Sequence, residues 1–184
     1  TDDSEISLVV ECMGGVNPAF EYVLKSLEKG KKVVTSNKML LAEKYKELQK
    51  YFNLLKYEAT VGGGIHIFHS IKDIKSVDKI KSFKGIINGT TNYILSSMTE
   101  NMSLDFDTVL KESQKLGYAE ADPSNDIDGI DAGYKAVLLY NEIFGDKKII
   151  NIKNVEIKGI RNISKEDIVK ANSEGKIIKL IAYG

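Results

Sequence analysis

The first third of the chain alternates short apolar runs with segments of helical periodicity, and this alternation restricts the fold more than any other feature. The apolar runs cover residues 6–10, 32–35 and 53–58, and two helices are predicted between them, over residues 18–30 and 37–48. Short links between alternating strands and helices imply parallel strands joined by right-handed crossovers. We therefore predict an α/β fold that begins with the second half of a doubly wound, Rossmann-like parallel sheet.

Local signals place the ends of these first elements. Asn17 is a favourable N-cap, Pro18 suits the first helical position, and Gly30 ends the first helix. Ser36 or Asn37 is expected to cap the second helix. The first apolar run shows no alternation, which is typical of a strand buried on both faces of a sheet.

After the glycines at 62–64 the pattern changes, so the chain is predicted to divide into two regions near residues 59–64. Helical periodicity predicts four helices, over residues 90–98, 106–116, 129–144 and 165–172. Partial alternation predicts strands over residues 77–87, 149–160 and 177–183. Residues 65–71 are compatible with either a helix or a strand. The second region is thus expected to be an α+β domain.

Composition excludes several classes of protein. The chain has 184 residues, with 26 basic and 26 acidic side chains, and a pI of about 6.7. A balanced charge argues against a partner that is a nucleic acid or a membrane surface. No apolar run approaches the roughly 18 residues that span a bilayer. The single Cys12 allows no internal disulfide, which favours the cytoplasm, and a start at Thr1 predicts a processed start or a piece of a longer chain.

The most acidic stretch, residues 118–131, suggests a calcium loop at first. Asp126, Asp128 and Gly129 fit its third, fifth and sixth positions, but Lys135 then falls at position twelve, where a bidentate Glu is required. The calcium-loop interpretation therefore fails. The remaining one is a solvated loop whose Asp side chains cap the start of a helix.

Two lysines are candidates for chemistry. Asp131 and Lys135 stand four residues apart, which is compatible with a surface ion pair or with a cleft lysine whose proton affinity a carboxylate tunes. Lys38 follows a strand-to-helix turn, where the carboxyl ends of parallel strands form a ligand crevice. A lysine in the first turn of a helix is also commonly solvated, and both alternatives stay open.

Other polar residues and the glycines give weaker evidence for a functional site. His66 and His69 are three residues apart without a third metal ligand nearby, so packing or surface roles are expected. Cys12 ends the first strand and is expected to be a buried small hydrophobe. No GxGxxG or Walker motif occurs, and the glycines at 62–64 do not fit a phosphate loop.

Several segments, in order along nearly the whole chain, resemble the homoserine dehydrogenase family. They are VVECMGG at 9–15, KVVTSNK at 32–38, YEATVGGGI at 57–65, GIINGTTNYIL at 85–95, and LGYAEADP at 116–123 with GIDAGYK at 129–135. The resemblance implies an oxidoreductase that interconverts L-aspartate 4-semialdehyde and L-homoserine with NAD or NADP, in threonine, methionine and isoleucine biosynthesis. It also implies a cytoplasmic homodimer.

The resemblance assigns roles to individual residues. Lys135 would be the proton donor to the carbonyl oxygen, and three residues would bind substrate: Glu120, Asp131 and Thr91. Four would lie along the cofactor: Met13, Gly14, Gly15 and Lys38. A monovalent cation, usually sodium, would be bound by the Glu58 carboxylate and by the backbone carbonyls of Val61, Gly63 and Ile65. One departure is His66, where the family has Pro, and this bears on the local turn.

The resemblance further implies that residues 1–61 are the C-terminal part of an NAD(P)-binding domain. Residues 62–184 would be an incomplete catalytic and dimerisation domain. The family's glycine-rich phosphate loop lies upstream of the position of Thr1, so this chain alone is expected to be inactive. Two alternatives stay open, a non-catalytic oligomerisation or regulatory module and a dehydrogenase acting on another substrate such as a sugar.

Overall fold

A computed structural model describes residues 2–184, which divide into two compact units. Unit 1 runs to Lys81 and also contains Tyr134–Val155, whereas unit 2 comprises Ser82–Gly133 and Glu156–Gly184. The division of the chain at residues 61 and 62 stays a prediction about its domains. Thr1, on which the expectation of a processed start rests, lies outside the described residues.

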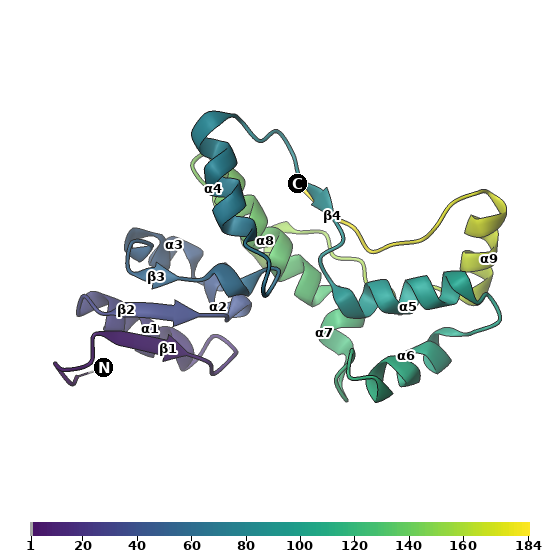
Figure 1. Ribbon diagram of the computed structural model, residues 1–184, viewed down its shortest axis with the longest axis horizontal. Coiled ribbons are helices and arrows are strands. Elements are labelled where there is room, and N and C mark those ends of the chain that lie inside the picture. Colours follow the sequence, from purple (N-terminus) through teal and green to yellow (C-terminus); the bar gives the residue numbers. More distant parts are fainter. Residues whose placement is uncertain (1) are drawn as a thin grey trace. The chain divides into compact units, whose positions relative to one another are not determined.

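Unit 1 is built on a parallel sheet in the order β1-β2-β3, which confirms the predicted strand–helix alternation. Its strands are β1 (Leu8–Glu11), β2 (Lys32–Thr35) and β3 (Leu55–Lys56). Helix α1 (Ala19–Glu28) packs on β1 and β2, and Figure 1 shows the three strands side by side with their arrows in one direction.

The prediction that the first strand is buried on both faces is wrong. Leu8 and Val10 are 50% and 62% exposed, whereas Val33 and Leu55, on the opposite face of the sheet, are 0% and 1% exposed. In a parallel sheet with the order β1-β2-β3, right-handed crossovers place the connecting helices on the same face. Alternate residues are therefore buried under these helices, and their neighbours face away from them.

The second predicted helix forms as two short ones, α2 (Lys38–Glu43) and α3 (Tyr45–Leu48). Asn37, one of the two predicted caps, is the N-cap of α2, and its side chain accepts a hydrogen bond from the backbone N–H of Leu40 at 3.0 Å. For α1 the predicted cap is wrong by one position, because Pro18 rather than Asn17 is the N-cap. Two 3₁₀ turns complete this part of the chain, Gln49–Tyr51 and Glu58–Thr60.

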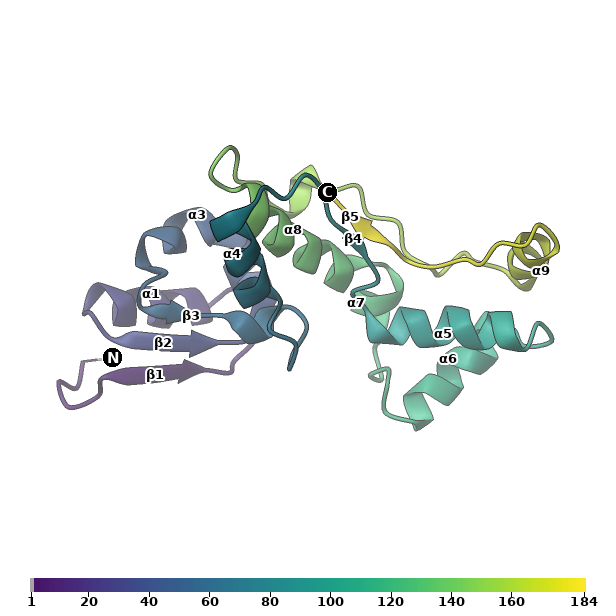
Figure 2. The ribbon, with the colours of Figure 1, turned by 45° about the horizontal axis from the view of Figure 1, so that its top comes forward.

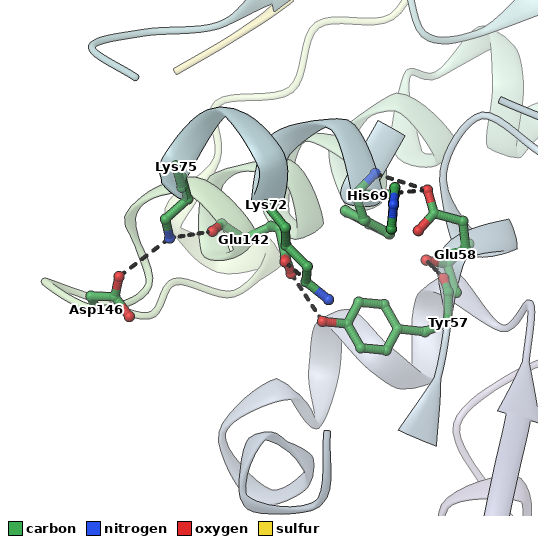
Figure 3. Close-up of polar contacts among 9 residues, drawn as sticks. Tyr57, Glu58, His69, Lys72, Lys75, Glu142 and Asp146 are labelled. Atoms are coloured by element: carbon green, nitrogen blue, oxygen red, sulfur yellow. Dashed lines mark hydrogen bonds and ion pairs between the residues drawn. The ribbon is translucent and has the colours of Figure 1, made fainter. Parts of the chain in front are cut away.

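The undecided segment after residue 65 is a helix, α4 (Ile67–Val77), and unit 1 also holds most of α8 (Ile130–Phe144). A polar network joins them. Glu142 on α8 is 8% exposed, accepts a hydrogen bond from the Tyr57 hydroxyl at 3.0 Å, and lies 3.6 Å from the Lys72 ammonium on α4. Figure 3 shows the Tyr57 and Lys72 side chains converging on the Glu142 carboxylate.

Unit 2 is mainly helical, with α5 (Gly89–Glu100), α6 (Phe106–Lys115), α7 (Ser124–Ile127) and α9 (Lys165–Ser173). Figure 2 shows α5 and α6 side by side, and α9 also packs on α5. The buried core of this unit consists of aliphatic side chains and one methionine: Ile94, Leu95, Met98, Val109, Ile127, Ile160 and Ile168. The helices predicted near 90–98, 106–116 and 165–172 are thus confirmed.

The three long strands predicted for the second region are wrong. Within 77–87 and 177–183 only β4 (Lys84–Gly85) and β5 (Ala182–Tyr183) form, as a short antiparallel pair. Residues 149–160 contain a 3₁₀ turn at Ile152–Asn154. Alternating apolar residues describe one buried face, but a strand also needs a neighbour for its backbone hydrogen bonds. Partial alternation therefore overestimated the strands.

Candidate functional site

The loop that follows β1 contains two successive glycines in the left-handed conformation. Gly14 and Gly15 have φ of 76° and 69°, and an added Cβ on either would meet nothing within 4 Å. Glycine is therefore favoured at both positions by backbone conformation rather than by lack of space. Met13 is 51% exposed. The loop lies at the carboxyl end of a parallel strand, the usual position of a ligand in such sheets.

A buried carboxylate braces this loop. Glu11 is 4% exposed, and its Oε1 accepts a hydrogen bond from the Met13 N–H at 2.7 Å while its Oε2 accepts one from the Thr35 hydroxyl at 2.5 Å. The Asn37 amide donates to the Gly15 carbonyl at 2.7 Å. The loop is thus tied to the end of β2 and to the start of α2. Sequence reasoning missed Glu11, whose signal was an acidic residue that ends an apolar run.

Lys38 and Lys135 both belong to unit 1. Lys38 is the half-buried first residue of α2, and Lys135 is half-buried on α8. Next to Lys135, the Tyr134 hydroxyl donates to the carboxylate of Glu43, the last residue of α2, at 3.2 Å. Burial and the Glu43 charge raise the pKa of Tyr134, so its hydroxyl stays protonated and this link between α8 and α2 persists.

Asp131 lies on α8, four residues and about one helical turn before Lys135, so the two side chains project from the same face of the helix. The Asp131 carboxylate accepts a hydrogen bond from the Asn88 side-chain amide at 2.9 Å. The same amide donates to Asp126 on α7 at 2.7 Å. The structure therefore brings two carboxylates to one buried amide. Sequence reasoning did not single out Asn88, and it considered Asp126 only as a ligand of the rejected calcium loop.

Thr91 is fully buried, with 0% exposure, in the first turn of α5. Its hydroxyl donates to the Asn88 side-chain oxygen at 2.9 Å, and its backbone N–H donates to the same oxygen at 2.8 Å. Thr91 therefore supports Asn88, and its own contact with substrate stays a prediction. The signal for Asn88 was its place before a predicted helix start, where asparagine is a preferred N-cap.

Glu120 is exposed, on a loop whose backbone is firmly held. The Gln114 side-chain amide donates to the Glu120 carbonyl at 3.0 Å, and the Thr90 hydroxyl donates to the Tyr118 carbonyl at 2.8 Å. The rings of Tyr93 and Tyr118 stack with centroids 4.9 Å apart. The loop therefore presents an exposed carboxylate from a fixed backbone.

Within the acidic stretch, residues 118–123 form a loop, as predicted, and Ser124–Ile127 form a short helix, α7. Asp128 at its end binds Arg161 through two hydrogen bonds of 2.7 and 2.8 Å, and this contact lowers the pKa of Asp128. The Asp128 charge is thus compensated by a guanidinium group. Among residues 2–184, no group of three or more His, Cys, Asp and Glu side chains is arranged to hold a metal ion.

Glu58 occupies the amino end of α4, as Figure 3 shows. One oxygen of its carboxylate accepts hydrogen bonds from the N–H groups of Phe68 at 2.9 Å and His69 at 3.4 Å. The other predicted cation ligands are backbone carbonyl oxygens in the glycine turn that follows. This turn is closed by a hydrogen bond of 3.1 Å from the Ile65 N–H to the Gly62 carbonyl. The carbonyl of Ile65 accepts from the Ile67 N–H, which leaves it a second lone pair.

This donor set suits a hard monovalent cation in its chemistry. It offers one carboxylate and three carbonyl oxygens, those of Val61, Gly63 and Ile65, and Gly62 and Gly63 have φ of 82° and 58°. Successive left-handed glycines let neighbouring carbonyls turn in directions that other residues disfavour. The role of these four residues as cation ligands stays a prediction.

Two further predictions concern the surface. Cys12 is exposed, so the expectation of a buried small hydrophobe is wrong, because the residue leaves the sheet with the loop after β1. His66 and His69 are both exposed, and His69 lies 3.9 Å from Asp73 one turn along α4. The two histidines therefore have the expected surface positions. No helix among residues 2–184 is both long and apolar enough to cross a bilayer.

A parallel sheet joined by helices, with a glycine loop at the carboxyl end of its first strand, is typical of the nucleotide-binding α/β domains found in dehydrogenases. Comparison of the sequence with family models agrees with this class and narrows it. The model described as homoserine dehydrogenase, NAD binding domain, matches residues 1–58, and the model described as homoserine dehydrogenase matches residues 67–184. The chain therefore belongs to the homoserine dehydrogenase family.

Individual relatives agree. The homoserine dehydrogenase of Lactococcus lactis is 43% identical over 182 residues, which cover 97% of this chain and 42% of that protein. A homoserine dehydrogenase structure from Thiobacillus denitrificans has a TM-score of 0.92 at 41% identity, and the match covers 99% of this chain and 42% of that one. A hyperthermophilic archaeal homoserine dehydrogenase in complex with NADPH has a TM-score of 0.78 at 29% identity, over 97% and 52% of the two chains. The chain thus spans about two fifths to one half of the length of these relatives.

Proposed function

We propose that this chain is the central part of an NAD(P)-dependent homoserine dehydrogenase, which interconverts L-aspartate 4-semialdehyde and L-homoserine. The observation that carries the proposal is the combination of Asp131, held by a buried amide, with Lys135 one helical turn further along α8. Family membership supports it, because the matches to the two family models cover the loop after β1 as well as α8. The activity is proposed for the longer polypeptide that the relatives imply.

The roles of the residues follow from their chemistry. Lys135 is proposed to donate a proton to the substrate's carbonyl oxygen, and its positive charge stabilises the negative charge that develops there. Glu120 is proposed to bind the ammonium group of the substrate, and Asp131 is proposed to bind the substrate and to orient the reacting centre beside Lys135. Thr91 is proposed to contribute to the substrate pocket, through Asn88 or by direct contact.

The cofactor would lie along the loop of Met13, Gly14 and Gly15 and beside Lys38. The exposure and left-handed backbone of the two glycines fit this role. When bound, the reduced nicotinamide supplies the hydride that reduces the carbonyl carbon. We propose either NAD or NADP, and the relative solved with NADPH supports the phosphorylated form as well. Residues 1–61 would then be the C-terminal part of the NAD(P)-binding domain.

A coupled assay tests this function. The full-length protein that carries this sequence is expected to oxidise NADPH or NADH when aspartate semialdehyde is added, and to reduce NADP or NAD with L-homoserine. A panel of sugar aldehydes should give at most a few per cent of that rate. Turnover of a sugar in preference would favour a different dehydrogenase, and no turnover of any substrate would favour the non-catalytic module.

The remaining features of the proposal are the compartment and the assembly. We propose a cytoplasmic homodimer. The single Cys12, which is a free cysteine, supports the compartment, and membership of the family supports the dimer. Light scattering coupled to gel filtration measures the mass of the assembly in solution. A monomeric mass at micromolar concentration would contradict the dimer.

We further propose that Glu58 and the following turn bind sodium. Replacement of choline chloride by sodium chloride at equal ionic strength is expected to raise the melting temperature by about 2 to 6 °C, because a ligand that binds only the folded state stabilises it. Glu58→Gln should abolish this gain. The amide oxygen of Gln still accepts from the Phe68 N–H, so the end of α4 stays capped while the negative charge is lost.

The matched control for this variant is Glu47→Gln, which removes an exposed carboxylate on α3 in the same unit. It should keep the sodium response. If the Glu58→Gln variant showed an equal rise in melting temperature, or if the unaltered protein melted at the same temperature in sodium chloride and in choline chloride, the sodium site would be refuted.

A further inference from the structure

We propose that Glu11, Thr35 and Asn37 are positioning residues for the cofactor. Their buried hydrogen-bond network holds the loop after β1 in one conformation before the cofactor binds. The inference rests on the proposed function, since it takes the cofactor to lie along residues 13–15, and it adds three residues that act through this loop. All of them belong to unit 1.

The loop itself has little packing to fix it. Residues 12–15 are all exposed, and an added Cβ on Gly14 or Gly15 would meet nothing within 4 Å. Glycine loses more backbone freedom than any other residue when it is ordered. If the loop were mobile in the free protein, the cost of ordering it would weaken the binding of a cofactor.

Hydrogen bonds hold the loop at both ends. At its start the Met13 N–H donates to Glu11 Oε1 at 2.7 Å, and at its end the Gly15 carbonyl accepts from Asn37 Nδ2 at 2.7 Å. Glu11 is 4% exposed and Asn37 is 8% exposed. An exposed glycine loop is therefore fixed by two buried side chains.

Thr35 joins these two side chains. It is 2% exposed, and its hydroxyl donates to Glu11 Oε2 at 2.5 Å and accepts from the Asn37 backbone N–H at 2.9 Å. The hydroxyl has one hydrogen, so a donor on one side and a carboxylate on the other determine its direction. Hydrogen bonds in such a chain polarise one another, and both ends of the loop are thus held by one network.

The orientation of the Asn37 amide is determined by the start of α2. Its Oδ1 accepts from the Leu40 N–H at 3.0 Å, and a backbone N–H can only donate, so Nδ2 faces the Gly15 carbonyl. The cap of α2 needs only the oxygen, and it does not explain the contact of the nitrogen. Lys38, which follows Asn37, is also proposed to lie beside the cofactor. One amide therefore sets the loop and the start of α2 relative to one another.

Strand pairing does not explain the network either. The backbones of β1 and β2 are already paired at this place, with Glu11 opposite Thr35. A buried carboxylate is costly unless it is hydrogen-bonded, and an apolar pair would join the strands without that cost. What the carboxylate adds is a second oxygen that reaches the Met13 N–H in the loop.

The test measures binding of the cofactor. In the full-length protein, Thr35→Val removes the hydroxyl and keeps the branched shape of the side chain. The Kd for NADPH, from calorimetric titration, is expected to rise about tenfold or more, the equivalent of one lost hydrogen bond. The kcat at saturating NADPH should stay within about threefold, because the loop can still be ordered by bound cofactor.

Thr35→Ser restores the hydroxyl and should bring the Kd back to within about threefold of that of the unaltered protein. Hydrogen exchange gives a second readout, in the protein without cofactor. The peptide that spans residues 11–17 should exchange faster in the Thr35→Val variant and at the unaltered rate in the Thr35→Ser variant, because exchange reports local opening.

Ser26→Ala is the matched control, because Ser26 is 0% exposed on α1 and its hydroxyl donates to the Tyr22 carbonyl at 2.7 Å. It removes a buried hydroxyl of the same unit and should leave the Kd unchanged. An equal rise in Kd for this control, or for Thr35→Ser, would overturn the positioning role, and so would an unchanged Kd for Thr35→Val. If the unaltered protein binds neither NADPH nor NADH, the proposed function itself fails, which is a different result.

A second variant guards against misfolding. Asn37→Ser keeps an oxygen that caps α2 but lacks the Nδ2 donor to Gly15, so the Kd for NADPH should rise about fivefold or more. Asp105→Ser, at the N-cap of α6, should leave it unchanged. With Thr35→Val in the same chain, the rise should be smaller than the product of the two single effects, because both release one loop. A full product, or no effect of Asn37→Ser, would refute the single network.

Discussion

Replacement of Lys135 by Met is expected to lower the turnover of aspartate semialdehyde by about 10²- to 10⁴-fold, the usual contribution of a general acid. Met matches the length of the Lys stem and fills the same half-buried place on α8, so the fold should persist. Because the proposed role of Lys135 is proton donation and charge stabilisation at the carbonyl oxygen, the Kd for NADPH should change less than threefold. Steady-state kinetics and calorimetric titration of the full-length protein measure the two quantities.

Two companion variants separate the proton from the charge. Lys135→Arg keeps a positive charge, but a guanidinium group does not release its proton at neutral pH, so turnover should stay low. Lys153→Met removes an exposed lysine of the same unit and should leave turnover unchanged. Added methylamine should partly restore the activity of a Lys135→Ala variant. Turnover of the Met variant within tenfold of the unaltered protein would refute the assignment.

The sequence predicts the sheet of unit 1 well because its signals are local. The apolar run 32–35 predicts a strand, Asn37 predicts a helix cap, and the helical repeat that follows predicts the helix. These signals lie within a few residues of one another, and the structure has all three elements. The strands predicted over 77–87 and 149–160 fail for the opposite reason. Their alternation indicates that one face contacts a core. A strand also needs a neighbouring strand, which is distant in the chain and is not revealed by the local sequence.

Some residues of the candidate site could likewise be predicted from the local sequence, and others could not. Asp131 and Lys135 are recognisable from their spacing and from the family resemblance, since four residues on a helix place both on one face. Asn88 is invisible as a site residue, because its contacts with Asp126 and Asp131 join positions 38 and 43 residues away in the chain. Glu11 is missed for a related reason. An acid at the end of an apolar run looks like a surface residue until Thr35 is found beside it.

Tyr57→Phe is expected to destabilise the protein by about 1–3 kcal/mol at pH 8, because it leaves a buried carboxylate short of a donor. The Tyr57 hydroxyl donates to Glu142, which is 8% exposed. Among residues 2–184, the other side-chain partner of the Glu142 carboxylate is the Lys72 ammonium at 3.6 Å. The ring itself should stay in place, since Phe preserves the contacts with Phe52 and Phe68 at 4.8 and 5.3 Å between centroids. Urea denaturation followed by circular dichroism measures the change.

The same tyrosine predicts how stability depends on alkaline pH. Burial, and then the Glu142 charge, raises the pKa of Tyr57 above its ordinary value of 10.0, and burial does the same for Tyr45. Above pH 10 the unfolded chain loses these phenolic protons while the folded protein keeps them. The unfolded state then binds fewer protons, and stability falls as pH rises, by up to about 1.4 kcal/mol per pH unit for each group.

Tyr57→Phe should therefore lose part of this alkaline slope as well as stability at pH 8. Tyr22→Phe is the matched control, because Tyr22 is 52% exposed on α1 in the same unit and its removal should change neither quantity. The stability at pH 8 and the alkaline slope both depend on Tyr57, but they measure different properties of its side chain. The loss at pH 8 measures the hydrogen bond that Glu142 accepts, and the slope measures the burial of the phenol. If the Phe variant kept both the stability and the slope of the unaltered protein, the Tyr57 hydroxyl would be in contact with water rather than with Glu142.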